Sequence, residues 1–320
     1  MRAPLLLAII LAAVSVVGCS TSGEDIVDEP PTTTEAPCTQ TMEPGVSNQS
    51  GTYDGEERTW QIAVPEGAPK GLIFDFHGTG GSPQVHDSIT RMSAEGTARG
   101  YVVITPQGLE NPARWTVPGI PGPDDVAFVE ALAEETILAA CVEGPVIATG
   151  KSSGAAMTSQ LACTSPTFSV FAPVAGINLY RRCATGAPIS VITFHGTADQ
   201  WVPYIGPDGW KEVEQETDTF FIGDVEATVA AFAERAECDQ PTQSELGGDT
   251  LITDFRCTVA EQVALYRIEG GGHTHPGTYA KERYEELGAT DTVGSTTETF
   301  DGTVVMLDFF DQVIDNRRSQ

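Results

Sequence analysis

One serine stands in a glycine-flanked segment whose setting favours nucleophilic chemistry. Residues 150–154 read Gly-Lys-Ser-Ser-Gly, a G-x-S-x-G pattern between an apolar, strand-like run at 146–149 and a helix-favouring run at 155–162. A sharp turn between a strand and a helix exposes the serine hydroxyl, and the start of the helix supplies positive potential for an oxyanion. We therefore predict that Ser152 is a nucleophile and that the N–H of Ser153 is an oxyanion donor. A chance glycine and serine turn is the alternative.

A nucleophilic serine needs a base, and an acid that orients the base. The histidines that follow Ser152 in the chain are His195, His273 and His275. Asp199 lies just past a strand-like run and can reach the base, so we predict Asp199 as the acid and the nearby His195 as structural. His273 follows three glycines, which leave room above the serine, and we predict it as the base. His275, which precedes a proline, is the alternative.

A second oxyanion donor is expected from the segment 76–82, which reads Phe-His-Gly-Thr-Gly-Gly-Ser and follows an apolar run at 72–76. A loop at this place supplies the other oxyanion N–H in the α/β-hydrolase arrangement, and Thr79 is the natural candidate. The glycines also suggest a phosphate-binding loop, but neither G-x-G-x-x-G nor a following Gly-Lys-Ser/Thr is present. Nucleotide binding by this loop is therefore excluded.

Short apolar runs rich in β-branched residues predict the strands that position these residues. The predicted strands are 72–76, 101–105, 146–149, 169–174, 189–194 and 263–268. Helical patterns lie between them: one at 85–92 stopped by Gly100, one capped by Asp124, and a last one at 304–314. This alternation predicts an α/β-hydrolase fold with a mostly parallel, doubly wound sheet. The segment 58–64 predicts an antiparallel edge strand, and 40–57 is too polar for a prediction.

The N-terminus has the features of an export signal. One arginine precedes the apolar run 5–17, which is too short to span a bilayer, so we predict a signal peptide at 1–18. The small residues before Cys19 resemble the lipobox of bacterial lipoproteins, which predicts that Cys19 is lipidated; an ordinary secretory signal is the alternative. Residues 19–37 then form a disordered tether, and 38–320 form the catalytic domain. We expect a secreted protein, anchored by lipid to the outer face of the bacterial membrane.

The net charge of the protein limits the kinds of partner that it can bind, and its cysteines predict disulfides. With 17 basic and 45 acidic residues, the net charge of −28 argues against nucleic acid and anionic polymers as partners. An adaptation for solubility is the alternative, and the favoured, explanation of this charge. Besides Cys19 the cysteines are Cys38, Cys141, Cys163, Cys183, Cys238 and Cys257. An even number in an exported chain predicts disulfides, with Cys238–Cys257 as the first choice. No CxxC or HExxH spacing is present, so we predict no metal and no cofactor.

The motifs together resemble the secreted esterase family of polyhydroxybutyrate depolymerases, feruloyl esterases and acetylxylan esterases, from about residue 58 to 310. The resemblance rests on His77-Gly78, the segment 124–128, the serine segment and its helix at 150–163, the segment 195–199, and Gly271-Gly272-His273. It implies the catalytic roles for Ser152, Asp199 and His273. It also implies the disulfides Cys163–Cys183 and Cys38–Cys141, in addition to Cys238–Cys257.

The chain departs from the family pattern beside two catalytic positions. Lys151 and Ser153 flank the serine, where the family usually has a hydrophobic residue or asparagine and a small residue. His275 stands where the family tends to have tryptophan two positions after the catalytic histidine. A different side chain beside the base changes which acyl groups the site prefers. We therefore place His275 among the candidate substrate-binding residues.

Tryptophans in two loops are further candidates for substrate binding. Trp201 and Trp210 follow the predicted acid, and Trp115 lies in the loop 106–122; local packing is the alternative for each. Residues 177–188 are too few to form a lid domain between their flanking strands. We expect an open site that suits esters projecting from polymers or at polymer ends.

These observations predict an extracytoplasmic serine carboxylic ester hydrolase, similar to polyhydroxybutyrate depolymerases and feruloyl esterases. Its expected partner is an ester substrate, either a small acyl ester or a polymeric one such as a polyester or a plant cell-wall polysaccharide ester. Membrane contact is expected only through the lipid anchor, and no nucleic acid is expected. A serine peptidase of the same fold and a non-catalytic binding lipoprotein are the alternatives.

Overall fold

The computed structural model describes residues 38, 41–117, 121–179, 186–206, 211–215, 218–257 and 261–319, with backbone only at 211–215 and 218–221. Cys38–Gln320 form one compact unit. The predicted signal peptide, Cys19 and the tether lie outside the described residues, as do Cys183 and Trp210. Within the described part, no helix has the length and apolar character that crossing a membrane requires.

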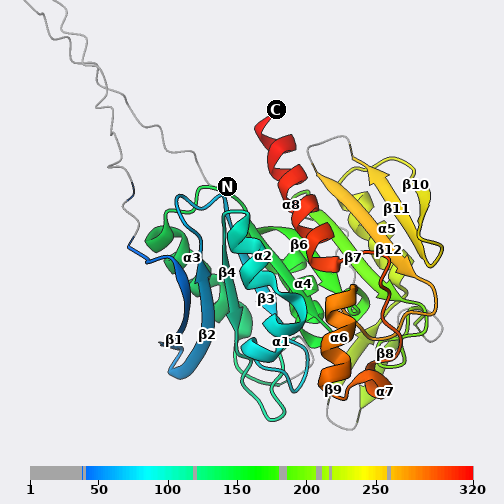
Figure 1. Cartoon of the computed structure of the whole chain (residues 1–320), viewed down its shortest axis with the longest axis horizontal. Coiled ribbons are helices and arrows are strands. Elements are labelled where there is room, and N and C mark those ends of the chain that lie inside the picture. Colours follow the sequence, from blue (N-terminus) through cyan, green and yellow to red (C-terminus); the bar gives the residue numbers. More distant parts are fainter. Residues whose placement is uncertain are drawn as a thin grey trace, which may run out of the picture. The chain divides into compact units, whose positions relative to one another are not determined.

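A ten-stranded sheet forms the centre of this unit (Figure 1). Its strands are β1 (Gly45–Tyr53), β2 (Glu56–Val64), β3 (Gly71–Phe76), β4 (Tyr101–Pro106), β5 (Val146–Lys151), β6 (Phe168–Val174), β7 (Ser190–Gly196), β10 (Thr242–Leu246), β11 (Thr250–Arg256) and β12 (Gln262–Ile268). Their order across the sheet is β1-β2-β4-β3-β5-β6-β7-β12-β11-β10. The strands from β4 to β12 are parallel, and the outer ones at both ends pair antiparallel.

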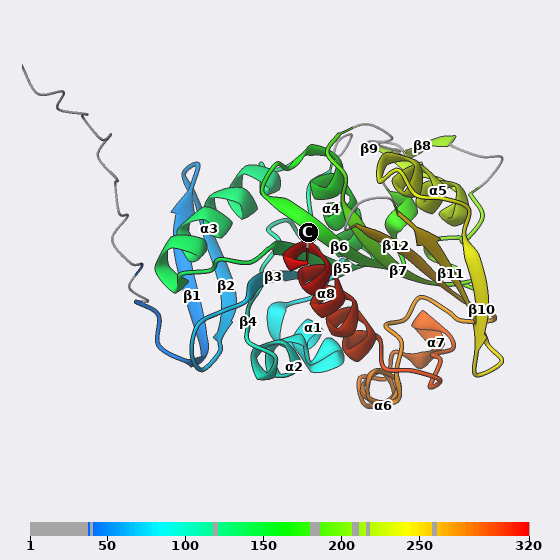
Figure 2. The ribbon, with the colours of Figure 1, turned by 90° about the horizontal axis from the view of Figure 1, so that it is seen from above.

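Helices cover both faces of the sheet (Figure 2). They are α1 (Pro83–Thr90), α2 (Met92–Ala98), α3 (Asp125–Ala140), α4 (Ser153–Thr164), α5 (Val225–Arg235), α6 (Thr278–Glu286), α7 (Thr290–Val293) and α8 (Gly302–Arg318). On one face α3, α4 and α5 bury Phe128, Met157 and Phe232 against the sheet. On the other, α2 and α8 bury Met92 and Phe310. The structure thus confirms the predicted doubly wound α/β fold.

Two local predictions are wrong. The strand at 58–64 is present as β2, but β1 pairs outside it and forms the edge. Most of β1 is exposed, so its residues lack the alternation of apolar and polar side chains that marks a half-buried strand. The helical pattern at 85–92 is also interrupted, because Arg91 adopts a left-handed φ of 55° and separates α1 from α2.

The hairpin of β8 (Lys211–Gln215) and β9 (Asp218–Ile222), inserted between β7 and β12, and the helix α5 that follows it were not predicted. In contrast, the segment between β6 and β7 has only the short 3₁₀ helix η1 (Ile177–Leu179) in its described part.

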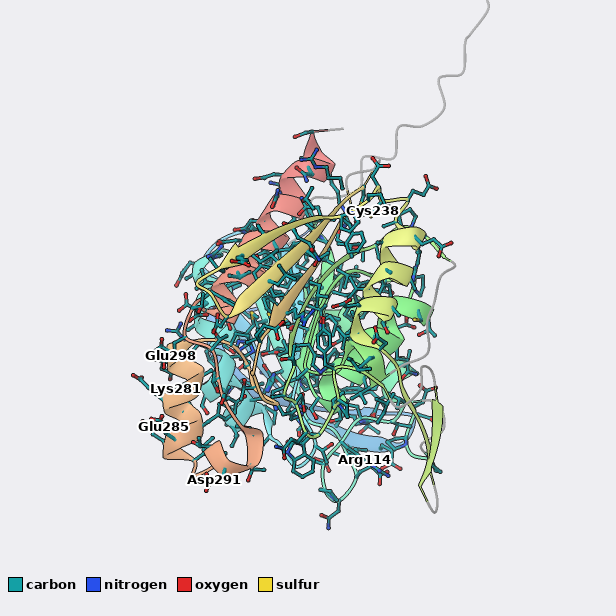
Figure 3. The ribbon with its side chains drawn as sticks, turned by 90° about the vertical axis from the view of Figure 1, so that its right-hand side faces the viewer. Arg114, Cys238, Lys281, Glu285, Asp291 and Glu298 are labelled. Atoms are coloured by element: carbon teal, nitrogen blue, oxygen red, sulfur yellow. A yellow bond between two sulfur atoms is a disulfide. The ribbon has the colours of Figure 1, made fainter. Side chains whose placement is uncertain are left out.

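The disulfides Cys38–Cys141 and Cys238–Cys257 are both formed, as predicted. The third predicted pair includes Cys183 and lies outside the described residues. In the view of Figure 3, Cys238 lies in the upper part of the molecule and Arg114, from the loop 106–122, lies in the lower part.

A buried ion pair fixes the start of α3 against β2. Arg58 Nη1 lies 2.6 Å from Asp125 Oδ1, and both side chains are almost completely buried. The other oxygen of Asp125 accepts the N–H of Thr116 at 2.7 Å. The pair therefore connects β2, α3 and the loop next to Trp115.

We expect Arg58→Met to lower the free energy of unfolding by about 3–5 kcal/mol, because it leaves the Asp125 carboxylate buried without its cation. Urea unfolding of the disulfide-bonded protein measures the change. Arg58→Met/Asp125→Asn should recover part of the loss, since the neutral amide still accepts the Thr116 N–H. A free energy of unfolding of Arg58→Met within about 1 kcal/mol of the wild-type value would contradict a stabilising role of this ion pair.

Candidate active site

The loops that carry the predicted site all follow parallel strands of the sheet. Thr79 comes after β3, Ser152 directly after β5, Asp199 after β7, and His273 after β12. Parallel strands present their carboxyl ends at the same edge of a sheet, and ligands bind in open α/β sheets at this edge. The strand order therefore brings together residues that are far apart in the sequence.

Ser152 adopts a strained backbone conformation at the turn from β5 to α4. Its φ of 60° and ψ of −119° are rare for a residue with a side chain, and its N–H donates to Val174 O at 3.0 Å. A glycine is also required at position 154, two residues after the serine, because a Cβ there would lie 2.1 Å from the carbonyl oxygen of Phe76. This geometry matches the predicted serine turn.

Asp199 and His273 form a buried hydrogen-bonded pair. The Nδ1–H of His273 donates to Asp199 Oδ2 at 2.7 Å, and the N–H groups of Trp201 and Val202 donate to Asp199 Oδ1 at 2.9 Å each. Burial alone would raise the pKa of Asp199, but the hydrogen bond and charge of His273 hold this pKa below its usual value. The ionised carboxylate thus fixes the ring so that Nε2 is free to accept a proton.

The glycines before His273 allow the loop to pack closely against its neighbours. A Cβ on Gly272 would lie 2.2 Å from Val293 O, and one on Gly196 would lie 2.2 Å from Gly271 O. The N–H of His273 also donates to Val293 O at 2.6 Å. The glycine-rich segment is therefore needed for close backbone contact, in addition to leaving room above the serine.

The other two histidine candidates occupy different positions. His195 donates through Nε2 to Val202 O at 2.8 Å, and this nitrogen lies 3.6 Å from Asp199 Oδ2, which agrees with a structural role. His275 is buried, and its Nε2 lies 3.0 Å from Thr303 Oγ1. The structure brings His273 against Asp199 and places His275 away from the described lining of the pocket.

His77, whose role was not predicted, fixes the loop that carries Thr79. Its Nδ1–H donates to Gly78 O at 2.7 Å, while its Nε2 accepts the N–H of Gly108 at 3.0 Å. Trp115 Nε1 donates to the carbonyl of His77 at 2.8 Å. Burial lowers the pKa of His77 to about 4, so the ring is neutral and can donate and accept at the same time.

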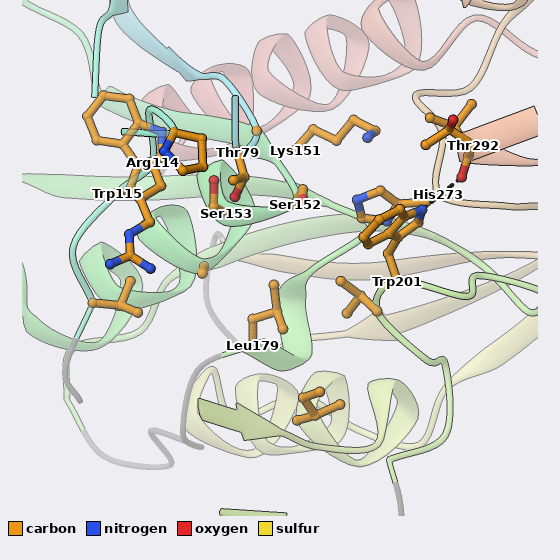
Figure 4. Close-up of a pocket in the computed structure, with 17 residues that line it drawn as sticks. Thr79, Arg114, Trp115, Lys151, Ser152, Ser153, Leu179, Trp201, His273 and Thr292 are labelled. Carbon is orange, nitrogen blue, oxygen red and sulfur yellow. Dashed lines mark hydrogen bonds between the residues drawn. The ribbon is translucent and has the colours of Figure 1, made fainter. Parts of the chain in front are cut away.

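One pocket contains most of the predicted site residues (Figure 4). Its lining consists of Gly78, Thr79, Pro112, Arg114, Trp115, Val117, Lys151, Ser152, Ser153, Ala156, Leu179, Trp201, Val202, Ile222, His273, Thr292 and Val293. Trp115 is buried, whereas Trp201 is 62% exposed and donates from Nε1 to Thr292 O at 2.8 Å. The site is thus a pocket with tryptophans, the serine and the imidazole in its wall.

Several lining residues carried no signal in the sequence. Leu179 comes from η1, Ile222 from the end of β9, and Thr292 from α7. None of them belongs to a motif, and they reach the pocket only through the packing of their elements. Among the described residues, no group of three or more His, Cys, Asp or Glu side chains is arranged to hold a metal ion.

Comparisons with known proteins agree with this geometry. The chain is 30% identical over 259 residues, 74% of its own length and 74% of the relative's, to the Nocardia uniformis subsp. tsuyamanensis protein named "Putative esterase NocK". It is 25% identical over 212 residues to feruloyl esterase B of Piromyces equi, covering 63% of this chain and 39% of that protein. No protein-family model matches the chain.

The solved structure of an acetyl xylan esterase from Aspergillus awamori superposes with a TM-score of 0.54 at 19% identity, covering 76% of this chain and 99% of the other. The fold and the placement of the pocket define an α/β hydrolase. The chain belongs to the same esterase family as NocK, which confirms the resemblance drawn from its motifs, and it is a carboxylic ester hydrolase.

We expect the His273 ring to stay neutral in solution down to a pH of about 4. Burial lowers the pKa of His273 to about 4, the positive charge of Lys151 lowers it too, and the bond to Asp199 opposes both effects. Nitrogen chemical shifts of labelled histidine, followed against pH, measure this value.

Lys151→Met should raise the pKa of His273, because it removes a nearby positive charge, and Asp199→Asn should lower it further. A wild-type pKa near the ordinary value of about 6.5 would contradict the arrangement.

Proposed function

We propose that the protein is an extracytoplasmic serine ester hydrolase in which Ser152 is the nucleophile, His273 the base and Asp199 the group that orients the base. The observation that carries this proposal is the Asp199–His273 hydrogen bond of 2.7 Å, made by a histidine that lines one pocket with Ser152. The strained turn at Ser152 supports it, because strain of this kind is typical of an exposed nucleophile.

In the proposed reaction Ser152 Oγ attacks the ester carbonyl while Nε2 of His273 takes the hydroxyl proton. The tetrahedral intermediate collapses, the alcohol leaves with the proton from His273, and the acyl group remains on Ser152. Water then gives a proton to His273 and attacks the acyl carbonyl. The acid leaves and the proton returns to Ser152, so the enzyme is restored.

The backbone N–H groups of Thr79 and Ser153 are the proposed donors to the oxyanion. Thr79 and Ser153 line the pocket together with Ser152, and Ser153 is the first residue of α4. The His77 bonds hold the Thr79 loop in place before substrate binds. Such preorganised donors stabilise developing charge without reorganisation during the reaction.

The proposed substrates are esters on polymers or small acyl esters. The pocket has apolar walls, and Trp115 and Trp201 line it. Trp201 is largely exposed and therefore available for stacking on a substrate that extends out of the pocket. Relatives named feruloyl esterase and acetyl xylan esterase support substrates of this class.

The proposed location is outside the cytoplasm, on a lipid anchor at Cys19 after removal of the signal peptide. Two formed disulfides support an oxidising compartment, because such bonds are rare in the cytosol. The apolar run before Cys19 and the small residues next to it support export and lipidation.

Ser152→Ala should lower the kcat for p-nitrophenyl acetate and methyl ferulate by about 10³-fold or more, because it removes the hydroxyl that attacks the ester. Wild-type protein should react covalently with a fluorophosphonate at Ser152, located by peptide mass spectrometry. Asp199→Asn should also lose most of its activity while keeping the fold. Full activity in Ser152→Ala would refute the mechanism.

Cys19→Ser should abolish incorporation of radiolabelled palmitate when the full chain is expressed in a bacterium that processes lipoproteins. The change removes the thiol that would carry the lipid, so the protein should shift from the membrane fraction to the soluble fraction. Equal labelling of the variant and the wild type would contradict lipidation at Cys19.

A further inference from the structure

Lys151 brings a positive charge into the wall of the active-site pocket. It is the last residue of β5, directly before Ser152, and it lines the pocket with Ser152 and His273. Figure 4 shows its side chain passing above Ser152 toward the side of the pocket that holds His273. Its Nζ lies 6.0 Å from the centre of the Tyr284 ring.

This lysine lacks the carboxylate partner that comparable lysines have. Lys70 lies 2.6 Å from Asp311, and Lys281 lies 3.1 Å from Glu298. In the described part of the chain, no carboxylate lies within ion-pair distance of Lys151, although the protein has 45 acidic residues. Asp199, whose charge acts on Lys151, is already bonded to His273 and two backbone N–H groups.

The described lining of the pocket has no aspartate or glutamate and includes the cationic Lys151. The Asp199 carboxylate lies behind His273, to which it is bonded. The complete chain has a net charge of −28. A lysine in a lining without carboxylates favours a negative group on the bound molecule over a neutral one.

When no anion is bound, the charge of Lys151 is unfavourable for the reaction. Burial lowers the pKa of Lys151 to about 8, because it disfavours the charged form of the side chain. The same charge lowers the pKa of His273 and so opposes the proton uptake that the base must perform. A negative group of the substrate near Lys151 would offset both effects.

We propose that Lys151 binds a carboxylate of the substrate, so that the preferred substrates are esters with one free carboxylate a few bonds from the reacting ester. This inference rests on the proposed function of the same pocket. Half-esters of dicarboxylic acids and the acid ends of hydroxy-acid oligomers belong to this class. Polymers with many negative charges do not, because the overall field of the protein repels them.

Two pairs of substrates that differ only in the charged group test the proposal. One pair places the carboxylate on the acyl side: p-nitrophenyl hydrogen adipate against p-nitrophenyl hexanoate. The other places it on the alcohol side: the linear dimer of 3-hydroxybutyrate against its primary amide. The ratio of kcat/KM for the acid to that for its neutral partner is measured at constant ionic strength and at pH 7.

In at least one pair, Lys151→Met should lower this ratio by about 10- to 100-fold, the range expected for a lost hydrogen bond to a charged group. Lys281→Met removes the same charge from α6, where Lys281 is paired with glutamates (Figure 3), and should leave the ratio unchanged. Lys151→Gln replaces Lys151→Met if the latter does not fold, as judged by circular dichroism and fluorophosphonate labelling.

An unchanged ratio in both pairs would overturn the proposal, and so would an equal loss for the acid and its neutral partner. The second result would mean that Lys151 acts on the shared chemistry of His273 or the oxyanion. Failure of the proposed function looks different, because neutral esters would then be hydrolysed equally by Ser152→Ala and wild type. Retained labelling of Ser152 with an unchanged ratio overturns only the role of Lys151.

Discussion

The strained backbone of Ser152 is the constraint on which the rest of the site depends. A left-handed conformation at a residue with a side chain costs about 1–3 kcal/mol, and it persists only where the surroundings enforce it. Here β5 and β6 hold the entrance to the turn, through the N–H of Ser152 on Val174 O, and α4 holds its exit. Contact with the backbone of Phe76 leaves no room for a side chain at Gly154. The strands β5 and β6 therefore support one side of the turn and α4 supports the other. The loop that follows β3 lies against the turn.

Asp199 and His273 are both held in place by hydrogen bonds with backbone groups. Asp199 is fixed by the N–H groups of Trp201 and Val202, and the loop of His273 by the carbonyl of Val293. Interactions of this kind do not depend on the side chains that line the pocket. The walls can therefore change in sequence while the reacting groups keep their places, which explains how a single fold accommodates different ester substrates.

The sequence predicted the parts of the structure that short-range patterns encode. Parallel strands buried on both faces appear as continuous apolar runs, so β3, β5 and β7 were found, together with the residues that follow them. The polar edge strand β1 has no such run, and Arg91 gives no sign of its left-handed turn. The positions of Leu179, Ile222 and Thr292 were not predictable, because their segments reach the pocket only through the order of the strands. For His77, the hydrogen bonds from Gly108 and Trp115 come from residues 31 and 38 positions away in the sequence.

The disulfide between Cys38 and Cys141 has a mechanical consequence. Cys38 precedes the edge strand β1, which is held to the sheet on one side only and could be peeled away one hydrogen bond at a time. A pulling force that reaches Cys38 from the N-terminal side passes through the disulfide to the end of α3, whose first residue Asp125 is joined to β2 by its ion pair. This force then does not act on β1, and it is borne by α3, which is packed on the core. The folded unit can thus bear tension at its N-terminal end without losing its outermost strand.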